Sequence, residues 1–252
     1  MKRYRLISEA QFELLVKERI AQATQTQHAD AERDRLRRQM DMAVLQAQIN
    51  PHFLYNTLEC IRGQALAAGA ADIADTTQAL SRFFRYSISI RDDVVPLKSE
   101  LDNVRNYMKI QQYRFQDRFQ LGIHYDQESP EVLDGLLPKL TLQPIVENAV
   151  VHGLSRKTQA ARIDIDIIQT QKHLNIQVSD NGRGMNQATL KNLSDMLNGQ
   201  KHTRDDASPG NGIAMENVMK RIQLFFGAEY GLTISSIEGV GTDVDIHIPY
   251  RT

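Results

Sequence analysis

The sequence predicts an α+β protein in which a long helix and a helical hairpin precede an α/β sandwich domain. Residues 1–50 contain neither glycine nor proline, and apolar residues recur there at helical spacing. After about residue 118, short runs of alternating apolar and polar residues indicate strands, with helical stretches between them. Nine of the 14 glycines follow residue 180. We therefore expect a change from a helical half to an α/β half near residues 91–96.

The composition of the 252-residue chain excludes several classes of protein. Hydrophobic residues make up 41% and charged residues 24%, as in a soluble globular protein, and the net charge of -1 gives no indication of nucleic acid as a partner. The single cysteine, Cys60, excludes an internal disulfide and is typical of a reducing cytoplasm. The cysteine usage thus favours a cytoplasmic location. No run approaches ~18 consecutive apolar residues, so we expect no membrane span in this chain.

Residues 1–39 are expected to form one long helix. Phe12, Val16 and Ile20 recur at helical spacing, and the following "TQTQHADAERDRLRRQ" is polar all round. An all-polar helix is either solvated or paired with a second helix through few contacts. We interpret the segment as one helix of a dimeric coiled coil.

Residues 40–93 are expected to form a helical hairpin. Its first helix carries apolar residues that alternate by three and four, namely Met40, Val44, Ala47, Pro51, Leu54, Leu58, Ile61 and Ala65. Gly63 and Gly69 indicate its end. A second amphipathic helix follows to about Ile90, with Ile73, Leu80, Phe83 and Phe84 on its apolar face. Two such helices bury little surface alone, so we expect a dimeric four-helix bundle.

Residues 94–252 are expected to form the α/β domain. A helix over "LKSELDNVRNYMKIQQYRF" places Leu97, Leu101, Val104, Met108 and Tyr113 near one face. The predicted strands are "FQLGIHY", "ARIDIDII", "LNIQVSD", "LTISSIE" and "TDVDIHIPY", and further helices are predicted over "LPKLTLQPIVENAVVHGL" and "GIAMENVMKRIQLFF". The polar segment 196–209 is either a mobile lid or an ordinary surface loop.

Four short motifs follow one another in this domain. "ENAVVHG" (147–153) ends a helix, "DNGRG" (180–184) follows a strand, "GNGIAMENVMKR" (210–221) opens a helix, and "GVGT" (239–242) lies in a turn. Neither a P-loop nor a strand–GxGxxG–helix unit is present in the sequence. Any one of these motifs alone would more often be an ordinary turn, but the ordered set of four is specific.

Each motif has a physical interpretation as part of a nucleotide site. Asp180 can present a carboxylate to an exocyclic amine while the glycines after it allow backbone to approach a flat base. Gly210 and Gly212 leave backbone N–H groups at a helix start that can bind phosphate. Asn148 can supply a neutral oxygen to a Mg²⁺ ion that also binds substrate phosphates.

The four motifs resemble the nucleotide-binding boxes of the GHKL superfamily, which includes gyrase, heat-shock chaperones and histidine kinases. Together with "QAQINPHFLYNTL" and "LQPIVENAVVHGL" they resemble the LytS/YesM-type sensor histidine kinases, from about residue 40 onward. The resemblance implies ATP and Mg²⁺ as ligands, with residues 1–39 as a signalling helix and 94–252 as the ATP-binding domain. The nucleotide-site residues that it implies are Asn148 (also the metal ligand), His152, Asp180, Gly182, Gly184, Gly210, Gly212, Lys220, Arg221 and Thr242.

The resemblance also implies that His52, in "NPHF", is the phosphoacceptor. Its spacing to Asn56 places both on one helical face, offset from the apolar seam, and an imidazole is mostly neutral at pH 7. Without the motif, His52 would be an ordinary surface histidine. Pro51 either bends the helix for a purpose or is a tolerated kink. Ile49, Phe53 and Tyr55 form a docking surface or are buried by a shift in register.

Two positions depart from related proteins. Phe53 occupies the place where many histidine kinases carry an acidic residue, so the proton acceptor is either Glu147 or no residue at all. Pro144 occupies the place of the glutamate found in ATP-hydrolysing relatives, which favours transfer to histidine over hydrolysis. The predicted function is autophosphorylation of His52 and transfer to a response-regulator receiver domain by a homodimer, with a membrane-anchored parent protein. The alternatives are a nucleotide-binding signalling adaptor and a GHKL-type ATPase.

Overall fold

The computed structural model describes residues 51–89, 93–116, 118–154, 161–199 and 211–251. The chain divides into two compact units, Met1–Leu54 and Tyr55–Thr252. The predicted helix over residues 1–39, the start of the bundle seam and Ile49 lie outside the described residues. No helix within the described ranges is long and apolar enough to cross a membrane.

The helical hairpin consists of α2 (Pro51–Ala67) and α3 (Ala71–Ile88). The prediction that Gly63 ends the first helix is wrong, because the helix continues through it to Ala67. Gly69 provides the actual stop, since its φ of 71° is the left-handed conformation that terminates helices.

Small residues form the buried face of α3, where Ala74, Ala79 and Ser81 are buried. Ile73, on the predicted apolar face of α3, is 43% exposed in the single chain, as is Ile61 on α2. Short side chains let α3 approach its neighbouring helix closely, so the larger residues lie beside the contact. Helical spacing alone does not show whether large or small residues form the contact.

Helix α4 (Leu97–Arg114) packs along α3. The rings of Phe83 and Tyr107 lie 5.8 Å apart, and Lys109 Nζ contacts Asp75 Oδ2 at 2.9 Å. Leu97, Leu101, Val104 and Met108 are buried as predicted. Tyr113 is 52% exposed, contrary to the prediction, and Tyr107 is the buried tyrosine of this helix.

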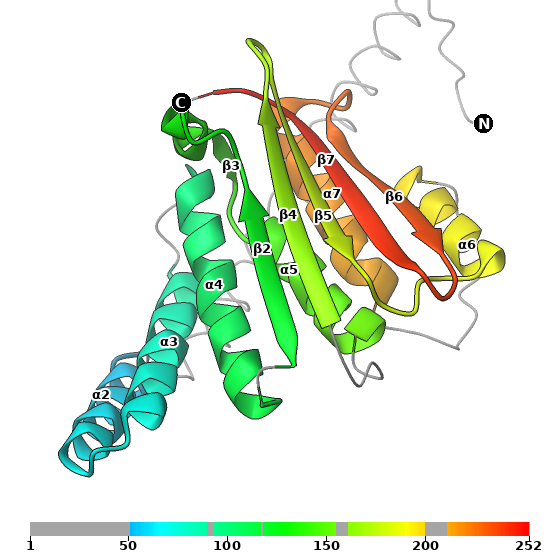
Figure 1. Cartoon of the computed structure of the whole chain (residues 1–252). Helices are drawn as coiled ribbons and strands as arrows, with labels where there is room; N and C mark the ends of the chain where they lie inside the picture. Colours follow the sequence, from blue (N-terminus) through cyan, green and yellow to red (C-terminus); the bar gives the residue numbers. More distant parts are fainter. Residues whose placement is uncertain (1–50, 90–92, 117, 155–160, 200–210, 252) are drawn as a thin grey trace, which may run out of the picture. The chain divides into compact units, whose positions relative to one another are not determined.

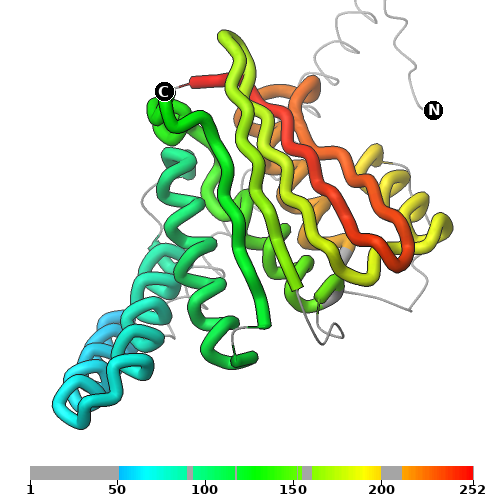
Figure 2. Tube along the Cα trace, viewed as in Figure 1, coloured from blue at the N-terminus to red at the C-terminus, as the bar shows by residue number. Residues whose placement is uncertain are grey.

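A five-stranded mixed sheet in the order β2-β4-β5-β7-β6 lies beside these helices (Figure 1). Its strands are β2 (Phe119–His124), β4 (Ala161–Gln169), β5 (His173–Asp180), β6 (Gly231–Ile237) and β7 (Gly241–Pro249), as the alternation predicted. Only β2 and β4 are parallel. Strands β5 and β7 lie side by side although β6 and stretches of described helix come between them in the chain (Figure 2).

The helix predicted over residues 137–154 is only partly present. Residues 136–138 form β3, which pairs with β1 (Val94–Pro96), and α5 covers only Leu142–Asn148 before a π-helical turn, η2 (Ala149–Leu154). Pro144 is tolerated in the first turn of a helix but not further inside. The helix therefore cannot begin much before Leu142.

Three further helical segments lie within the described residues. A short 3₁₀ helix covers Pro130–Asp134, and α7 covers Asn211–Phe226. Helix α6 (Gln187–Leu197), which was not predicted, begins where Asn186 Oδ1 accepts a hydrogen bond from the Thr189 amide at 2.8 Å. Helices α4, α5 and α7 all lie on one face of the sheet (Figure 1).

The core lies between this helical layer and the sheet. Ile163, Ile165 and Ile167 of β4 are buried, whereas the residues between them point to the opposite face. Leu174, Ile176 and Val178 of β5 follow the same alternation. The predicted α+β class is confirmed, and the sheet has one face against helices and one open face.

Candidate nucleotide-binding site

Asp180 and Thr242 meet at one end of the sheet. Asp180 is the last residue of β5 and pairs in register with Thr242 of β7. Because alternate residues of β5 face the helices, the Asp180 side chain extends the buried row that ends at Val178. Two positions predicted separately thus lie side by side on the helix-covered face.

Two glycines pack closely around the Asp180 carboxylate. A Cβ at Gly153 would lie 2.8 Å from Asp180 Oδ1, and one at Gly182 would lie 2.6 Å from the same atom. The Gly182 amide donates to this oxygen at 2.7 Å, and the Arg183 amide donates to the Gly153 carbonyl at 3.0 Å. The end of the 147–153 motif is therefore joined to the 180–184 loop around one carboxylate.

The turn at 239–242 closes the same end of the sheet. The Gly239 amide donates to the Arg183 carbonyl at 2.7 Å, and Ser236 Oγ lies 3.0 Å from Thr242 Oγ1. Gly184 has a φ of 62° and lies against the Ile237 carbonyl, so a side chain there would be both strained and blocked. Three of the four motifs therefore form one continuous backbone structure around Asp180.

Asn148 is half-buried at the junction of α5 and the π-helical turn. Glu147 Oε1, next to it, accepts a hydrogen bond from Gln143 Nε2 at 2.7 Å, and Gln143 Oε1 accepts one from Asn103 Nδ2 at 2.6 Å. His152 follows one turn later within η2. A series of side-chain hydrogen bonds thus connects α4 to the residue that precedes Asn148.

The fourth motif is only partly described. Gly210 lies outside the described residues, whereas Gly212 lies in the first turn of α7 against Met196 of α6. Lys220 forms an ion pair with Glu216. Arg221 donates to the carbonyls of Lys139 and Leu140, the latter at 3.1 Å. Its predicted contact with phosphate stays a prediction.

His52 and Asn56 lie one turn apart on α2, and both are exposed. Phe53 is 69% exposed, whereas Tyr55 is half-buried with the Arg85 guanidinium 5.2 Å from its ring centre. His52 belongs to the unit Met1–Leu54, and the nucleotide motifs belong to Tyr55–Thr252.

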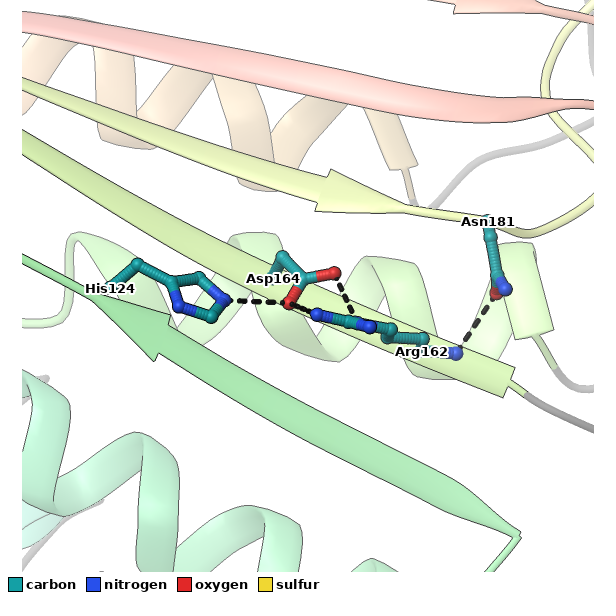
Figure 3. Close-up of polar contacts among 4 residues, drawn as sticks. All are labelled: His124, Arg162, Asp164 and Asn181. Atoms are coloured by element: carbon teal, nitrogen blue, oxygen red, sulfur yellow. Dashed lines mark hydrogen bonds and ion pairs between the residues drawn. The ribbon is translucent and has the colours of Figure 1, made fainter.

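A polar cluster on the open face supports the start of the 180–184 loop (Figure 3). Asn181 Oδ1 accepts a hydrogen bond from the Arg162 amide at 2.9 Å, and the Arg162 guanidinium binds Asp164 through two contacts of 2.6 and 2.8 Å. His124 Nε2 lies 3.0 Å from Asp164 Oδ1. The hydrogen bond from Arg162 lowers the pKa of Asp164. Sequence reasoning missed this cluster, because alternation predicted only that these residues face solvent.

Two hollows, of about 440 and 300 Å³, lie over the open face. The smaller one borders Asp180 but is lined mainly by residues of the open-face rows, such as Asp164, Ser179 and Asp243. The contact between Gly153 and the Asp180 carboxylate places that side chain on the opposite, helix-covered face. The larger hollow is lined by none of the predicted nucleotide-site residues, so neither hollow is the predicted nucleotide pocket.

The residues present fit ATP and Mg²⁺. Gly153 and Gly182 leave no room for side chains beside the Asp180 carboxylate, which suits a flat base next to it. Within the described ranges, no three His, Cys, Asp or Glu residues are grouped to hold a metal ion. A single amide oxygen from Asn148 suits Mg²⁺, which commonly takes few protein ligands together with substrate phosphates.

Two family models match this chain. Residues 40–119 match the histidine kinase family, and residues 134–252 match the histidine kinase-, DNA gyrase B- and HSP90-like ATPases. The sensor histidine kinase YesM of Bacillus subtilis is 37% identical over 222 residues, which cover 88% of this chain and 35% of that protein. The sensor protein LytS of Oceanobacillus iheyensis is 36% identical over 218 residues, which cover 86% and 36%.

The chain therefore spans about a third of the length of these curated relatives. Among solved structures, the histidine kinase domain of the Erythrobacter litoralis EL346 blue-light activated histidine kinase is 16% identical, with a TM-score of 0.45. The superposition covers 82% of this chain and 90% of that one.

Proposed function

Because this chain belongs to the histidine kinase family and resembles its LytS and YesM members, we propose that it is the catalytic part of a two-component sensor kinase. It transfers the γ-phosphoryl group of ATP to His52, and a receiver-domain aspartate of a response regulator then takes that group. The observation that carries this proposal is the convergence of three separate motifs around Asp180, in a chain that also contains "NPHF".

The nucleotide is held by the residues around Asp180. The Asp180 carboxylate accepts a hydrogen bond from the exocyclic amine of adenine, while Gly182 and Gly184 let backbone approach the base. Asn148 holds Mg²⁺, which neutralises charge on the phosphates when it is bound. His152, Gly210, Gly212, Lys220, Arg221 and Thr242 complete the proposed site.

His52 supplies the nucleophile. The unprotonated ring nitrogen of a neutral imidazole forms a bond to the γ-phosphorus, the bond from that phosphorus to the bridging oxygen breaks, and ADP leaves with the electron pair. The imidazole then loses its proton, either to Glu147 or to solvent. Most of the rate enhancement comes from positioning and charge neutralisation rather than from activation of the nucleophile.

Pro144 supports transfer to histidine over hydrolysis. It lies in the first turn of α5, where ATP-hydrolysing relatives would carry a glutamate that activates water. A proline side chain has neither a donor nor an acceptor, so it cannot orient a water molecule. The site is therefore better suited to a nucleophile that is already in place.

The test is labelling with γ-labelled ATP and Mg²⁺. The chain should become labelled on His52, and the label should survive base and be lost in acid, as expected of a phosphoramidate. His52→Gln should abolish the label and leave ATP affinity unchanged. His247→Gln, which changes another exposed histidine, is the matched control and should label normally.

One further variant tests the metal site, and the pattern of labelling separates the alternatives. Asn148→Asp should weaken labelling because it alters the metal site while the acceptor remains. Label that persists in His52→Gln would place the acceptor elsewhere. Tight ATP binding without any label would favour the nucleotide-binding adaptor, and steady phosphate release without label would favour an ATPase.

We also propose a homodimer that forms through residues 40–93. The hairpin leaves Ile61, Leu66 and Ile73 each more than 40% exposed, and a second hairpin would cover them in a four-helix bundle. Light scattering at micromolar concentration should give twice the mass of one chain. We further propose that the parent protein is a membrane-anchored sensor and that this part lies in the cytoplasm.

A further inference from the structure

The buried carboxylate of Glu100 connects elements that lie far apart in the sequence. Its side chain is fully buried on α4, and it accepts hydrogen bonds from Tyr86 Oη, from the Leu140 amide at 2.6 Å and from the Leu142 amide at 2.8 Å. Tyr86 lies in the last turn of α3, and Leu142 begins α5. One carboxylate therefore joins the end of the hairpin to the start of the helix that carries Asn148.

Arg221 brings α7 to the same place. Its guanidinium donates to the carbonyls of Lys139 and Leu140, next to the amides that Glu100 accepts. Burial lowers the pKa of Arg221, and the charge of Glu100 opposes that shift. We call Tyr86, Glu100, Leu140, Leu142 and Arg221 the Glu100 cluster. It connects α3, α4, α5 and α7.

The backbone at Leu140 is held in an uncommon conformation. Its φ is 60°, in the left-handed region that residues other than glycine seldom occupy. Its amide binds Glu100 and its carbonyl binds Arg221, so both polar groups of this residue are satisfied by charged side chains. Such conformations persist when their surroundings fix them, and they concentrate at functional sites.

Both carboxyl oxygens of Glu100 are used as acceptors. Burial raises the pKa of this carboxyl, whereas the hydrogen bonds from Tyr86, Leu142 and Leu140 oppose the rise. The Leu140 and Leu142 amides can only donate, and each binds a different oxygen of Glu100. The cluster therefore depends on both oxygens.

We propose that Glu100 is a positioning residue that couples the end of α3 to the nucleotide site, an inference that rests on the proposed nucleotide binding. Helix α5 extends only six residues beyond Leu142, so its start lies roughly 9 Å along the axis from Asn148. A displacement of Tyr86 acts on the same carboxylate that fixes this start. The state of the hairpin thereby alters the position of Asn148, and bound nucleotide alters the hairpin in return.

The reciprocal effect can be measured without phosphoryl transfer. Hydrogen exchange at residues 81–89 is followed in the whole chain, with and without saturating Mg²⁺–ADP. In the unsubstituted protein, ADP should slow exchange there about fivefold, a ratio typical of coupled sites. Tyr86→Phe keeps the ring but removes the hydroxyl, so it should bind ADP with nearly unchanged affinity and lose this response.

Tyr250→Phe is the matched control. It also removes a single hydroxyl, one that donates to the Glu131 carbonyl at 2.9 Å outside the Glu100 cluster. It should retain the full response to ADP, although its thermal stability can fall as much as that of Tyr86→Phe. Glu100→Gln should lose the response and also bind ADP about fivefold more weakly, because it offers one acceptor oxygen in place of two.

Two results would overturn the proposed coupling. The first is ADP that binds without any change at residues 81–89, and the second is a Tyr86→Phe chain that responds like the unsubstituted one. Failure of the kinase function gives a different result, in which the exchange response is intact but His52 remains unlabelled. A chain that binds no ADP would overturn both.

Discussion

The close packing around Gly182 predicts that a side chain at this position lowers the stability of the protein, and Gly63 offers a control. A Cβ at this position would lie 2.5 Å from the carbonyl carbon and oxygen of Gly153, and 2.6 Å from Asp180 Oδ1. Two of these three atoms are backbone and cannot turn aside. Gly182→Ala should therefore lower the free energy of unfolding by about 1–3 kcal/mol, as overpacking typically does.

Gly63→Ala makes the same chemical change where there is space. Gly63 lies inside α2, and no atom of the described residues lies within 4 Å of an added Cβ. Alanine loses less conformational entropy than glycine on forming a helix, so the free energy of unfolding should rise by about 0.5–1 kcal/mol. The two substitutions should thus have effects of opposite sign.

Urea denaturation followed by circular dichroism measures both variants, and a fluorescent ATP analogue measures nucleotide affinity. Gly182→Ala should also weaken the analogue about tenfold, equivalent to about 1.4 kcal/mol, because the Asp180 carboxylate is displaced. Gly63→Ala should leave the affinity unchanged. A Gly182→Ala chain as stable as the unsubstituted protein would refute the close contact between residues 153 and 182.

Two further predictions concern carboxylates. In Asp180→Asn the amide oxygen must stay toward the Gly182 amide, so its NH₂ group faces the adenine amine. ATP binding should therefore weaken by about 1–3 kcal/mol. Unchanged affinity in a titration would remove Asp180 from the site. Asp164 has a lowered pKa, so its stabilising contribution is present above the ordinary aspartate pKa of about 4 and is lost as the pH falls through the lower folded value. At pH 7 the Asp164→Asn variant should therefore have a free energy of unfolding lower than that of the unsubstituted protein by no more than about 1 kcal/mol, and this difference should disappear in acid. Equal pH profiles of the two proteins in urea denaturation would contradict this.

The sequence predicted the sheet well because alternation is a local signal. Strands β4 and β5 each have a buried row and an outward row, and Asp180 could be read as the end of one row. Strands β1 and β3 have three residues each, which is too few for an alternating pattern to be recognised. Their pairing depends on the fold and not on their own sequence.

The partners of Glu100 could not be read from sequence. A glutamate in the first turn of a helix normally faces solvent and favours the positive end of the helix dipole. Here it is buried, and two of its donors lie about 40 residues further along the chain. The helix stop predicted at Gly63 was wrong because glycine inside a helix lowers its stability but does not by itself end it. Packing of other residues of the helix can keep it intact.

The position of β7 has a consequence for how the protein is made. This strand follows β6 in the chain but lies between β5 and β6 in the sheet, so it must enter a gap between strands already synthesised. Until the ribosome has released residues 241–249, β5 and β6 each expose an unpaired edge, and such edges promote aggregation. A nascent chain stopped before residue 241 would also lack Thr242 beside Asp180. In the proposed site, nucleotide therefore meets Thr242 only after β7 has been made.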